Sequence, residues 1–175
     1  MKNIYCIVGP SGSGKTTIAK RLAFTNGMSA VESYTTRPPR YPNEEGHIFV
    51  SDEEFDALGE MCAYTEYNGY RYGVTPDIIE ANDIYVIDPY GVKYLKEHYH
   101  GYKGVKAIRL VVEADICKQR MIERGDSNQY ARSRLENDRK DFAIDNEPAY
   151  DFYVRNINRE STINAILDFI YEQEK

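Results

Sequence analysis

The chain has 175 residues, with 22 Lys and Arg against 28 Asp and Glu, and therefore a formal net charge of −6. This length fits one domain with a hydrophobic core, and a composition of 42% apolar and 29% charged residues excludes a wholly disordered chain. No stretch approaches the roughly 20 apolar residues that cross a bilayer, and the widely spaced cysteines predict neither a disulfide framework nor a zinc site. The first residues also lack the pattern of a signal peptide, so a reducing cytoplasm is the expected compartment.

Strands and helices are predicted in alternation along the first half of the chain. Residues 3–8 form a short apolar run that is typical of a buried strand. Glycines follow, and then a helix that has Ile18 and Leu22 on one face. Ser51 to Glu54 have the pattern of a capping box at the start of a short helix. Thr75-Pro76 places a cap and a proline at the start of another helix.

The second half continues this alternation. Residues 84–87 and 105–112 predict two more buried strands, and residues 115–124 predict a helix that ends at Gly125. The polar stretch after Gly125 predicts a mobile loop, and Ser161 begins a final helix with an apolar face. The whole pattern predicts an α/β fold, in which helices cover both faces of a parallel sheet and ligands bind at the carboxyl ends of the strands.

The strongest motif lies directly after the first predicted strand. Residues 9–16, GPSGSGKT, match GxxxxGK[ST] in full and open a helix, as a phosphate-binding loop must. Glycines let backbone N–H groups turn toward a phosphate, and the helix presents its positive end to it. Lys15 would reach the β- and γ-phosphates, and the Thr16 hydroxyl would hold Mg²⁺. The predicted ATP-binding residues are Gly9, Ser11, Gly12, Ser13, Gly14, Lys15, Thr16 and Thr17.

Further motifs follow this loop in a fixed order. They are Ser33-Tyr-Thr-Thr-Arg-Pro-Pro-Arg40, Gly46, Phe49-Val-Ser51, Gly69-Tyr-Arg-Tyr-Gly73, Asp88, Gly91-Val-Lys93 and the spacing Arg120…Arg124-Gly125…Arg134-Leu135. From first strand to last helix, this order resembles the guanylate kinase family. The resemblance implies a P-loop NTPase-type sheet with a small acceptor-binding insertion and an arginine-bearing lid. It also implies transfer of the γ-phosphate of ATP to a nucleoside monophosphate, typically GMP, with Mg²⁺.

The family pattern implies a division of the single domain, residues 1–175. Residues 1–32, 75–117 and 141–175 would form the core, 33–74 the acceptor-binding region and 118–140 the lid. By resemblance, Arg37, Arg40 and Tyr72 would hold the phosphate of the acceptor. Guanidinium forks bind phosphate oxygens bidentately, although two solvated arginines in a surface turn are the alternative.

The loop after these arginines is two residues shorter than is usual in the family, where it carries a second tyrosine. His47 takes the nearest position, either as a donor to phosphate or as an exposed residue. Guanylate kinases usually read guanine with a serine, a glutamate, a hydroxyl residue and an aspartate. At these four positions the chain has Ser33, Ala63, Val74 and Asp88.

Two of the four base-reading positions have therefore lost their polar groups. Glu66 lies three residues beyond Ala63, and an odd offset on a strand points to the opposite face. Thr75 follows Val74 and would substitute only if the turn shifts. A site without these partners discriminates less between bases, so the sequence leaves the base specificity of the acceptor open.

Magnesium and the lid complete the predicted site. Thr16 is the expected ligand of Mg²⁺, while Asp88 has three open roles: it holds a water on the metal, reads an amino group of the acceptor or caps the next helix. Many family members carry another carboxylate where this chain has Val86. The resemblance implies that the lid arginines close on the phosphates, because phosphoryl transfer depends on positioning and charge neutralisation. The predicted catalytic residues are Lys15, Arg37, Arg120, Arg124 and Arg134.

Charge is distributed unevenly along the chain. Residues 1–40 have a net charge of +5 and residues 118–140 of +3, whereas 41–117 have −9 and 141–175 have −5. The acidic total argues against long nucleic acids and anionic membranes as partners, but not against small nucleotides held between the basic stretches. The oligomeric state stays open.

Two rival interpretations remain at the level of the sequence. One is a kinase of the same fold that acts on another phosphorylated acceptor, such as a different NMP, a dNMP or a ribose bisphosphate. The other is a non-catalytic guanylate kinase-like binding module, against which the presence of Lys15 and Thr16 argues.

Overall fold

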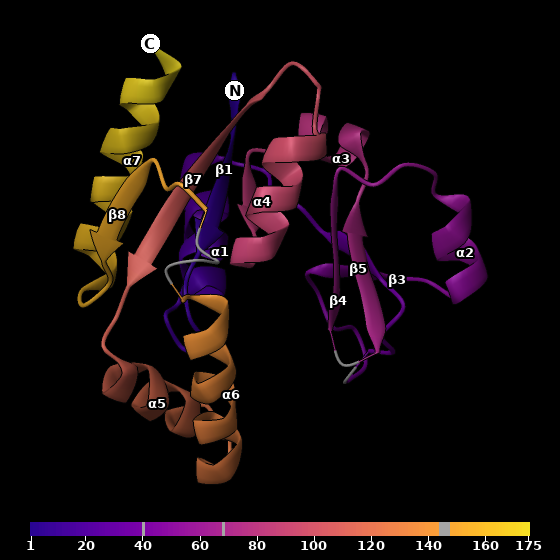
Figure 1. Cartoon of the computed structure of the whole chain (residues 1–175). Coiled ribbons are helices and arrows are strands. Elements are labelled where there is room, and N and C mark those ends of the chain that lie inside the picture. Colours follow the sequence, from indigo (N-terminus) through magenta and orange to yellow (C-terminus); the bar gives the residue numbers. More distant parts are fainter. Residues whose placement is uncertain (40, 68, 144–147) are drawn as a thin grey trace.

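The computed structural model describes residues 1–39, 41–67, 69–143 and 148–175. Its central sheet has the order β6-β1-β7-β8, in which every pair of neighbours is parallel (Figure 1). These strands are β1 (Asn3–Val8), β6 (Ile84–Val86), β7 (Gly104–Val111) and β8 (Phe152–Arg155). The predicted α/β fold is confirmed, and the predicted strands are found within one residue of their expected bounds.

Strand β1 is buried on both faces and therefore forms the middle of the core. All six of its residues are buried. Ile4, Cys6 and Val8 pack into one hydrophobic cluster, whereas Tyr5 and Ile7 pack into a second, as the period of two in a strand requires. The second cluster includes residues of α1 (Lys15–Asn26) and α7 (Arg159–Glu174). The first includes residues of α3 (Pro76–Ala81) and α4 (Pro89–His98), so helices cover both faces.

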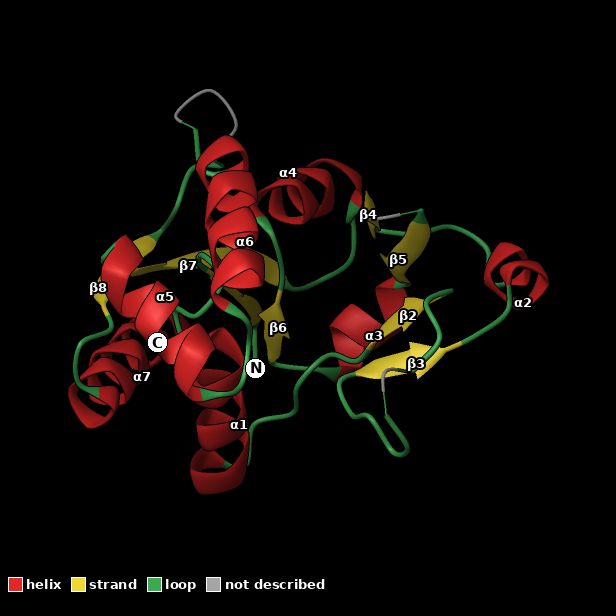
Figure 2. Ribbon diagram, turned by 90° about the horizontal axis from the view of Figure 1, so that it is seen from below, coloured by secondary structure: helices red, strands yellow, loops and turns green. Residues whose placement is uncertain are grey.

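A second, smaller sheet holds the region expected to bind the acceptor. Its order is β3-β2-β5-β4, with β2 (Ser33–Thr35), β3 (His47–Phe49), β4 (Ala63–Tyr67) and β5 (Tyr70–Val74). Helix α2 (Asp52–Ala57) follows β3 and begins with the predicted capping box of Ser51 and Glu54. In both views, α4 lies between the two sheets (Figures 1 and 2).

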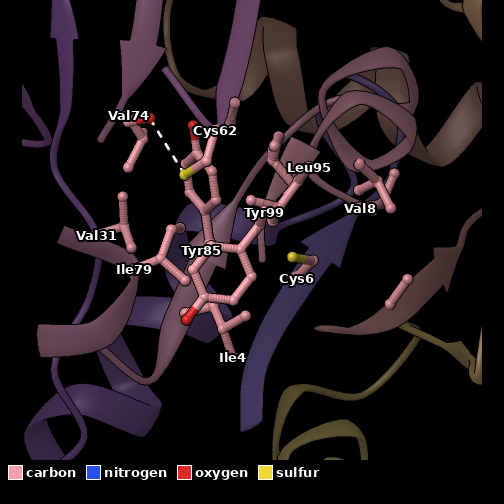
Figure 3. Packing of buried hydrophobic residues seen from close by; sticks show 14 residues of the cluster. Ile4, Cys6, Val8, Val31, Cys62, Val74, Ile79, Tyr85, Leu95 and Tyr99 are labelled. Carbon is pink, nitrogen blue, oxygen red and sulfur yellow. Dashed lines mark hydrogen bonds between the residues drawn. The ribbon is translucent and has the colours of Figure 1, made fainter. Parts of the chain in front are cut away.

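The two sheets share one hydrophobic cluster. Figure 3 shows Ile4 and Cys6 of β1 packed close to Tyr85, Leu95 and Tyr99, which in turn approach the small sheet. At the far side of the cluster, the Cys62 Sγ donates a hydrogen bond to the carbonyl of Val74, at 3.3 Å (Figure 3). The three cysteines of the chain are buried and unpaired.

Helices α5 (Ala114–Glu123) and α6 (Asn128–Asp141) lie beyond the carboxyl end of β7 (Figure 1). The expected loop after Gly125 is wrong for most of its length, because Ser127 caps α6 by accepting a hydrogen bond from the Tyr130 N–H. Of the residues in α6, Ala131 is buried and the rest are polar or partly exposed, so no apolar periodicity marks the helix.

The final helix, α7, also begins two residues earlier than expected. Asn158 caps it, and the side chain of Asn158 accepts a hydrogen bond from the Ser161 N–H. Over the part of the chain that the structure describes, no helix combines the length and apolar character needed to cross a membrane.

Candidate active site

The phosphate loop joins β1 to α1 and is held in place by two close contacts. Gly12 and Gly14 have φ angles of +77° and +94°, which L side chains rarely adopt. A Cβ on Gly12 would lie 2.3 Å from the Cys117 carbonyl oxygen of α5, and one on Gly14 would lie 2.7 Å from the Asn156 amide nitrogen. The glycines of the motif therefore permit both the turn and the approach of neighbouring chain.

Lys15 is folded over its own loop. Its Nζ donates to the carbonyls of Gly9 and Pro10, at 2.7 and 3.1 Å. Burial lowers the pKa of Lys15 to about 8; the carboxylate of Asp138 opposes this shift and the charge of Arg134 adds to it. The ammonium is thus poorly solvated and lies between charges of both signs.

Two side chains of α6 reach the phosphate loop at Ser11. The Asp138 carboxylate accepts hydrogen bonds from the Ser11 N–H at 2.8 Å and from the Ser11 hydroxyl at 3.2 Å. Arg134 Nε donates to the same hydroxyl at 3.0 Å. Arg134 was predicted at the site and Asp138 was not. Their spacing of four residues would have indicated one helical face, had α6 been recognised.

A buried polar network fixes the other side of the loop. Asn156 follows β8, is 5% exposed, and its Nδ2 donates to the Ser13 carbonyl at 2.7 Å. Its Oδ1 accepts from the Thr162 hydroxyl at 3.1 Å, which fixes the orientation of the amide. Arg120 donates to the Asn156 carbonyl at 3.0 Å and lies 3.5 Å from the Ser13 carbonyl. Asn156 was missed, although a polar residue at the end of a parallel strand is a signal for this edge of the sheet.

A cavity of about 560 Å³ extends from the phosphate loop to the small sheet. This volume is in the range of small-molecule sites. Eight predicted site residues line it: Gly9, Ser11, Lys15, Ser33, His47, Tyr72, Asp88 and Arg134. The cavity thus brings together the predicted ATP-binding loop, part of the predicted acceptor site and one lid arginine.

The acceptor side of the cavity is built by β2, β3 and β5. The Ser33 hydroxyl and His47 Nδ1 are 2.9 Å apart, and the His47 ring meets the Tyr72 ring edge-on at 5.7 Å between centroids. Asp88 accepts a hydrogen bond from the Gly91 N–H at 2.8 Å and so caps α4, while it also lines the cavity. His47 is therefore half-buried beside Ser33 rather than exposed, and the capping role of Asp88 is present together with a position in the cavity.

Arg37 is held by an ion pair next to the cavity wall. It is 7% exposed and is not among the residues that line the cavity. Its guanidinium forms a two-pronged pair with the buried carboxylate of Glu44, with N–O distances of 2.8 and 3.1 Å, and also donates to the Pro38 carbonyl. Arg40 lies outside the described residues.

Two of the four positions expected to read the base form an apolar patch. Ala63 of β4 and Val74 of β5 are directly opposite each other, and both are at most 1% exposed. Two residues further along, Thr65 is opposite Tyr72, and both line the cavity. Thr75 caps α3 without a side-chain hydrogen bond and does not line the cavity.

Glu66 lies on the face of β4 that strand parity predicts, but it still reaches the cavity. It lines the cavity together with Ala63, although the two residues are on opposite faces of β4. The reason is that β4 is the edge strand of the small sheet, so the cavity reaches around it. The hydroxyl of Tyr64, which shares a face with Glu66, donates to the Glu66 carboxylate at 2.5 Å.

Arg124, Thr16 and Thr17 are not among the residues that line the cavity. Arg124 is exposed and donates to the carboxylate of Asp126, with N–O distances of 2.6 and 2.8 Å. Thr16 and Thr17 are exposed in the first turn of α1, next to Lys15.

The sequence did not predict that one side of the cavity is acidic, where Asp88, Asp138 and Asp141 line it. Burial raises the pKa of the Asp141 carboxyl, and the nearby charges of Asp88 and Asp138 raise it further.

Comparison with known proteins gives matches over most of the chain. The family model described as an AAA domain matches residues 6–142. A guanylate kinase of Neisseria gonorrhoeae is 32% identical over 181 residues, which cover 96% of this chain and 86% of that protein. A ribose 1,5-bisphosphate phosphokinase of Thiobacillus denitrificans is 30% identical over 140 residues, which cover 75% of this chain and 73% of that protein.

A solved structure gives the same fold. The guanylate kinase of Anaplasma phagocytophilum superposes with a TM-score of 0.69 at 24% sequence identity, and the match covers 98% of this chain and 85% of that one.

Proposed function

The chain belongs to the guanylate kinase family, and from that membership we propose that it transfers the γ-phosphoryl group of ATP to a nucleoside monophosphate, with GMP as the leading acceptor. The observation that carries the proposal is one cavity of about 560 Å³, lined by both the phosphate loop and the acceptor side. Two substrates bound in one cavity place the reacting phosphates next to each other, which is the main contribution an enzyme makes to phosphoryl transfer.

The phosphate loop would bind ATP through its backbone N–H groups and through Lys15. Arg134 would join it, since its guanidinium already reaches the loop at Ser11. Arg120 would stabilise the loop indirectly, because it donates to the carbonyl of Asn156, whose side chain binds Ser13. Arg124 would have to leave Asp126 to reach a phosphate, and such an exposed ion pair costs little to break.

The acceptor would lie against Ser33, His47, Tyr72 and Asp88, which line the other part of the cavity. Arg40 and Arg37 are proposed to lie near its phosphate. Arg37 would also anchor the loop that runs from it to Glu44, through the ion pair between these two side chains. The attacking oxygen belongs to a phosphate that is ionised at neutral pH, so the reaction needs no general base. Residues 33–74 are proposed as the acceptor-binding region and residues 118–140 as the lid.

The residues of this chain suit Mg²⁺, which prefers oxygen ligands and keeps several waters. Thr16 presents a hydroxyl in the exposed first turn of α1, and the Asp88 carboxylate lines the same cavity as Lys15. Thr16 would hold the ion directly and Asp88 would hold one of its waters. When bound, the ion would neutralise charge on the β- and γ-phosphate oxygens.

A specific observation favours a second acceptor class. Ala63 and Val74 form an apolar patch where the family usually carries polar base-reading groups. A relative that covers 75% of this chain is named a ribose 1,5-bisphosphate phosphokinase. A phosphorylated sugar needs no base reader, so such an acceptor is the alternative to GMP.

One assay tests the proposal and separates the two acceptors. ADP production from ATP and Mg²⁺ is measured with GMP, IMP, AMP, their deoxy forms and ribose 1,5-bisphosphate. We expect turnover with GMP, with weak discrimination against other bases because two readers are apolar. A preference for ribose 1,5-bisphosphate would select the alternative, and no turnover with any acceptor would refute the proposal.

The lowered pKa of Lys15 makes nucleotide binding depend on pH. The pKa is about 8 in the free enzyme, and bound phosphates would raise it. Between these two pKa values the complex keeps a proton that the free enzyme has lost, so affinity falls as the pH rises above about 8. Calorimetry of ADP binding at pH 8, in buffers of different ionisation enthalpy, should show uptake of about half a proton. Lys15→Arg, which does not titrate, should remove this uptake; the same uptake in both proteins would contradict the assignment.

Asn156 is expected to position the phosphate loop. In Asn156→Ala, the Ser13 carbonyl loses its buried donor, and the KM for ATP should rise about tenfold. Asn158→Ala is the matched control, because it removes the cap of α7, costs about 1 kcal/mol of stability and leaves the loop untouched. Steady-state kinetics and urea unfolding on both variants separate the two effects. An equal KM for ATP in both variants would show that Asn156 acts on stability alone.

The proposed compartment is the cytoplasm, and the proposed partners are small nucleotides. Support comes from the three buried, unpaired cysteines and from the acidic net charge of −6.

A further inference from the structure

The contact between Asp138 and Ser11 places a carboxylate against the phosphate loop. Both of its oxygens are engaged, one by the Ser11 N–H at 2.8 Å and one by the Ser11 hydroxyl at 3.2 Å. Arg134, one helical turn away on α6, donates to the same hydroxyl. The contact spans 127 residues of sequence, so it ties the lid helix to the loop rather than stabilising a local turn.

The donors at Ser11 are of the kind that a phosphate uses. The loop precedes the positive end of α1, where an anion is favoured. Asp138 also lines the cavity together with Lys15 and Ser11, so its charge faces the space in which phosphates would lie. A carboxylate and a phosphate at the same donors repel each other, and one of them must leave.

We propose that Asp138 is a tethered competitor of the nucleotide. In the free enzyme its carboxylate occupies the anion-binding donors of Ser11 and holds α6 against the phosphate loop. A nucleotide phosphate displaces it, so binding is coupled to a shift of the lid helix. This inference rests on the proposed function, because it takes the loop as the ATP site.

The competition has a measurable size. When the competent state is only a fraction of the free protein, the apparent Kd is the intrinsic Kd divided by that fraction. Hydrogen bonds to a charged group favour the occupied state by about tenfold or more. Loss of the Asp138 charge should therefore tighten nucleotide binding by about tenfold.

The experiment measures the Kd for ADP by calorimetry, with and without Mg²⁺, on the full chain at fixed ionic strength. Asp138→Asn removes the charge with little change in shape, and Asp138→Ala removes the contact while keeping a good helix former. Glu136→Gln is the matched control, since Glu136 is exposed on the same helix and lines a different surface hollow. We expect about tenfold tighter binding in both Asp138 variants and no change in the control.

A second readout tests the contact itself. Hydrogen exchange of the Ser11 amide should be faster in free Asp138→Ala than in the free wild type, and equal in the two ADP complexes. An unchanged Kd in both Asp138 variants would overturn the proposal. A weaker Kd would also overturn it and would make Asp138 part of the nucleotide site.

Failure of this inference is distinguishable from failure of the proposed function. Wild-type enzyme that phosphorylates an acceptor, with the same Kd for ADP as both variants, refutes the competition alone. Absence of ADP binding in all proteins, together with absence of turnover, refutes both.

Discussion

Replacing Lys15 by alanine is expected to lower kcat by about a thousandfold while the chain stays folded. The ammonium is buried enough that its pKa falls to about 8, so its charge acts in a poorly solvated site where electrostatic stabilisation is strong. A pKa below the ordinary value also means that the folded state disfavours the charged form. Removal of Lys15 should therefore not lower the free energy of unfolding at neutral pH.

Lys20→Ala is the control for this variant. Lys20 is on the same helix, and its ion pair with Glu45 is exposed on both sides, so neither kcat nor stability should change much. Kinetics and urea unfolding are measured on both variants. If Lys15→Ala keeps more than about a tenth of the kcat, the phosphate loop does not act as proposed.

Replacing Arg37 by alanine is expected to lower the free energy of unfolding by about 3–5 kcal/mol. The Arg37 and Glu44 side chains are 8% and 6% exposed, so the substitution leaves a buried carboxylate without its counter-ion. The same carboxylate raises the pKa of Arg37, as expected of a tight pair. The KM for the acceptor should also rise, because the loop next to Tyr72 loses its anchor.

The double variant Arg37→Met with Glu44→Leu separates the charge from the packing. Because apolar side chains often replace a buried ion pair without loss, this variant should recover most of the stability. Urea unfolding of the wild type, the single variant and the double variant tests this. A loss below about 1 kcal/mol in Arg37→Ala would show that the pair is solvated and of little value.

The phosphate loop and the central sheet were predictable because their signals are local. The glycines of residues 9–14, the strand before them and the helix after them follow from adjacent residues. The short apolar run of residues 3–8 predicts a buried strand, because a strand that is covered on both faces carries apolar residues on both of them.

Helix α6 could not be found from hydrophobic periodicity, because Ala131 is its buried residue and the other residues carry no apolar pattern. Asp138 was lost with it, since its role depends on sharing a face with Arg134. The net charge of +3 for residues 118–140 does not show which carboxylates lie against which arginines. In the structure Asp126 pairs with Arg124, whereas Asp138 and Arg134 meet at Ser11.

Contacts between segments that are distant in the sequence could not be predicted from it either. The register that sets Ala63 opposite Val74 and Thr65 opposite Tyr72 is a property of the small sheet as a whole. Asn156 acts on Ser13 across 143 residues of chain, and the partner of Arg37 depends on how the loop to Glu44 folds back. Such pairs carry no local pattern.

We propose that the γ-phosphoryl group of ATP passes directly to a nucleotide acceptor bound in the same cavity. The most direct measurement follows ATP labelled in its γ-phosphate, incubated with Mg²⁺, GMP and the wild-type chain. We expect the label to appear in the β-phosphate of GDP, at the rate at which ADP forms. Label that remains in ATP, or that appears only as inorganic phosphate, would contradict it.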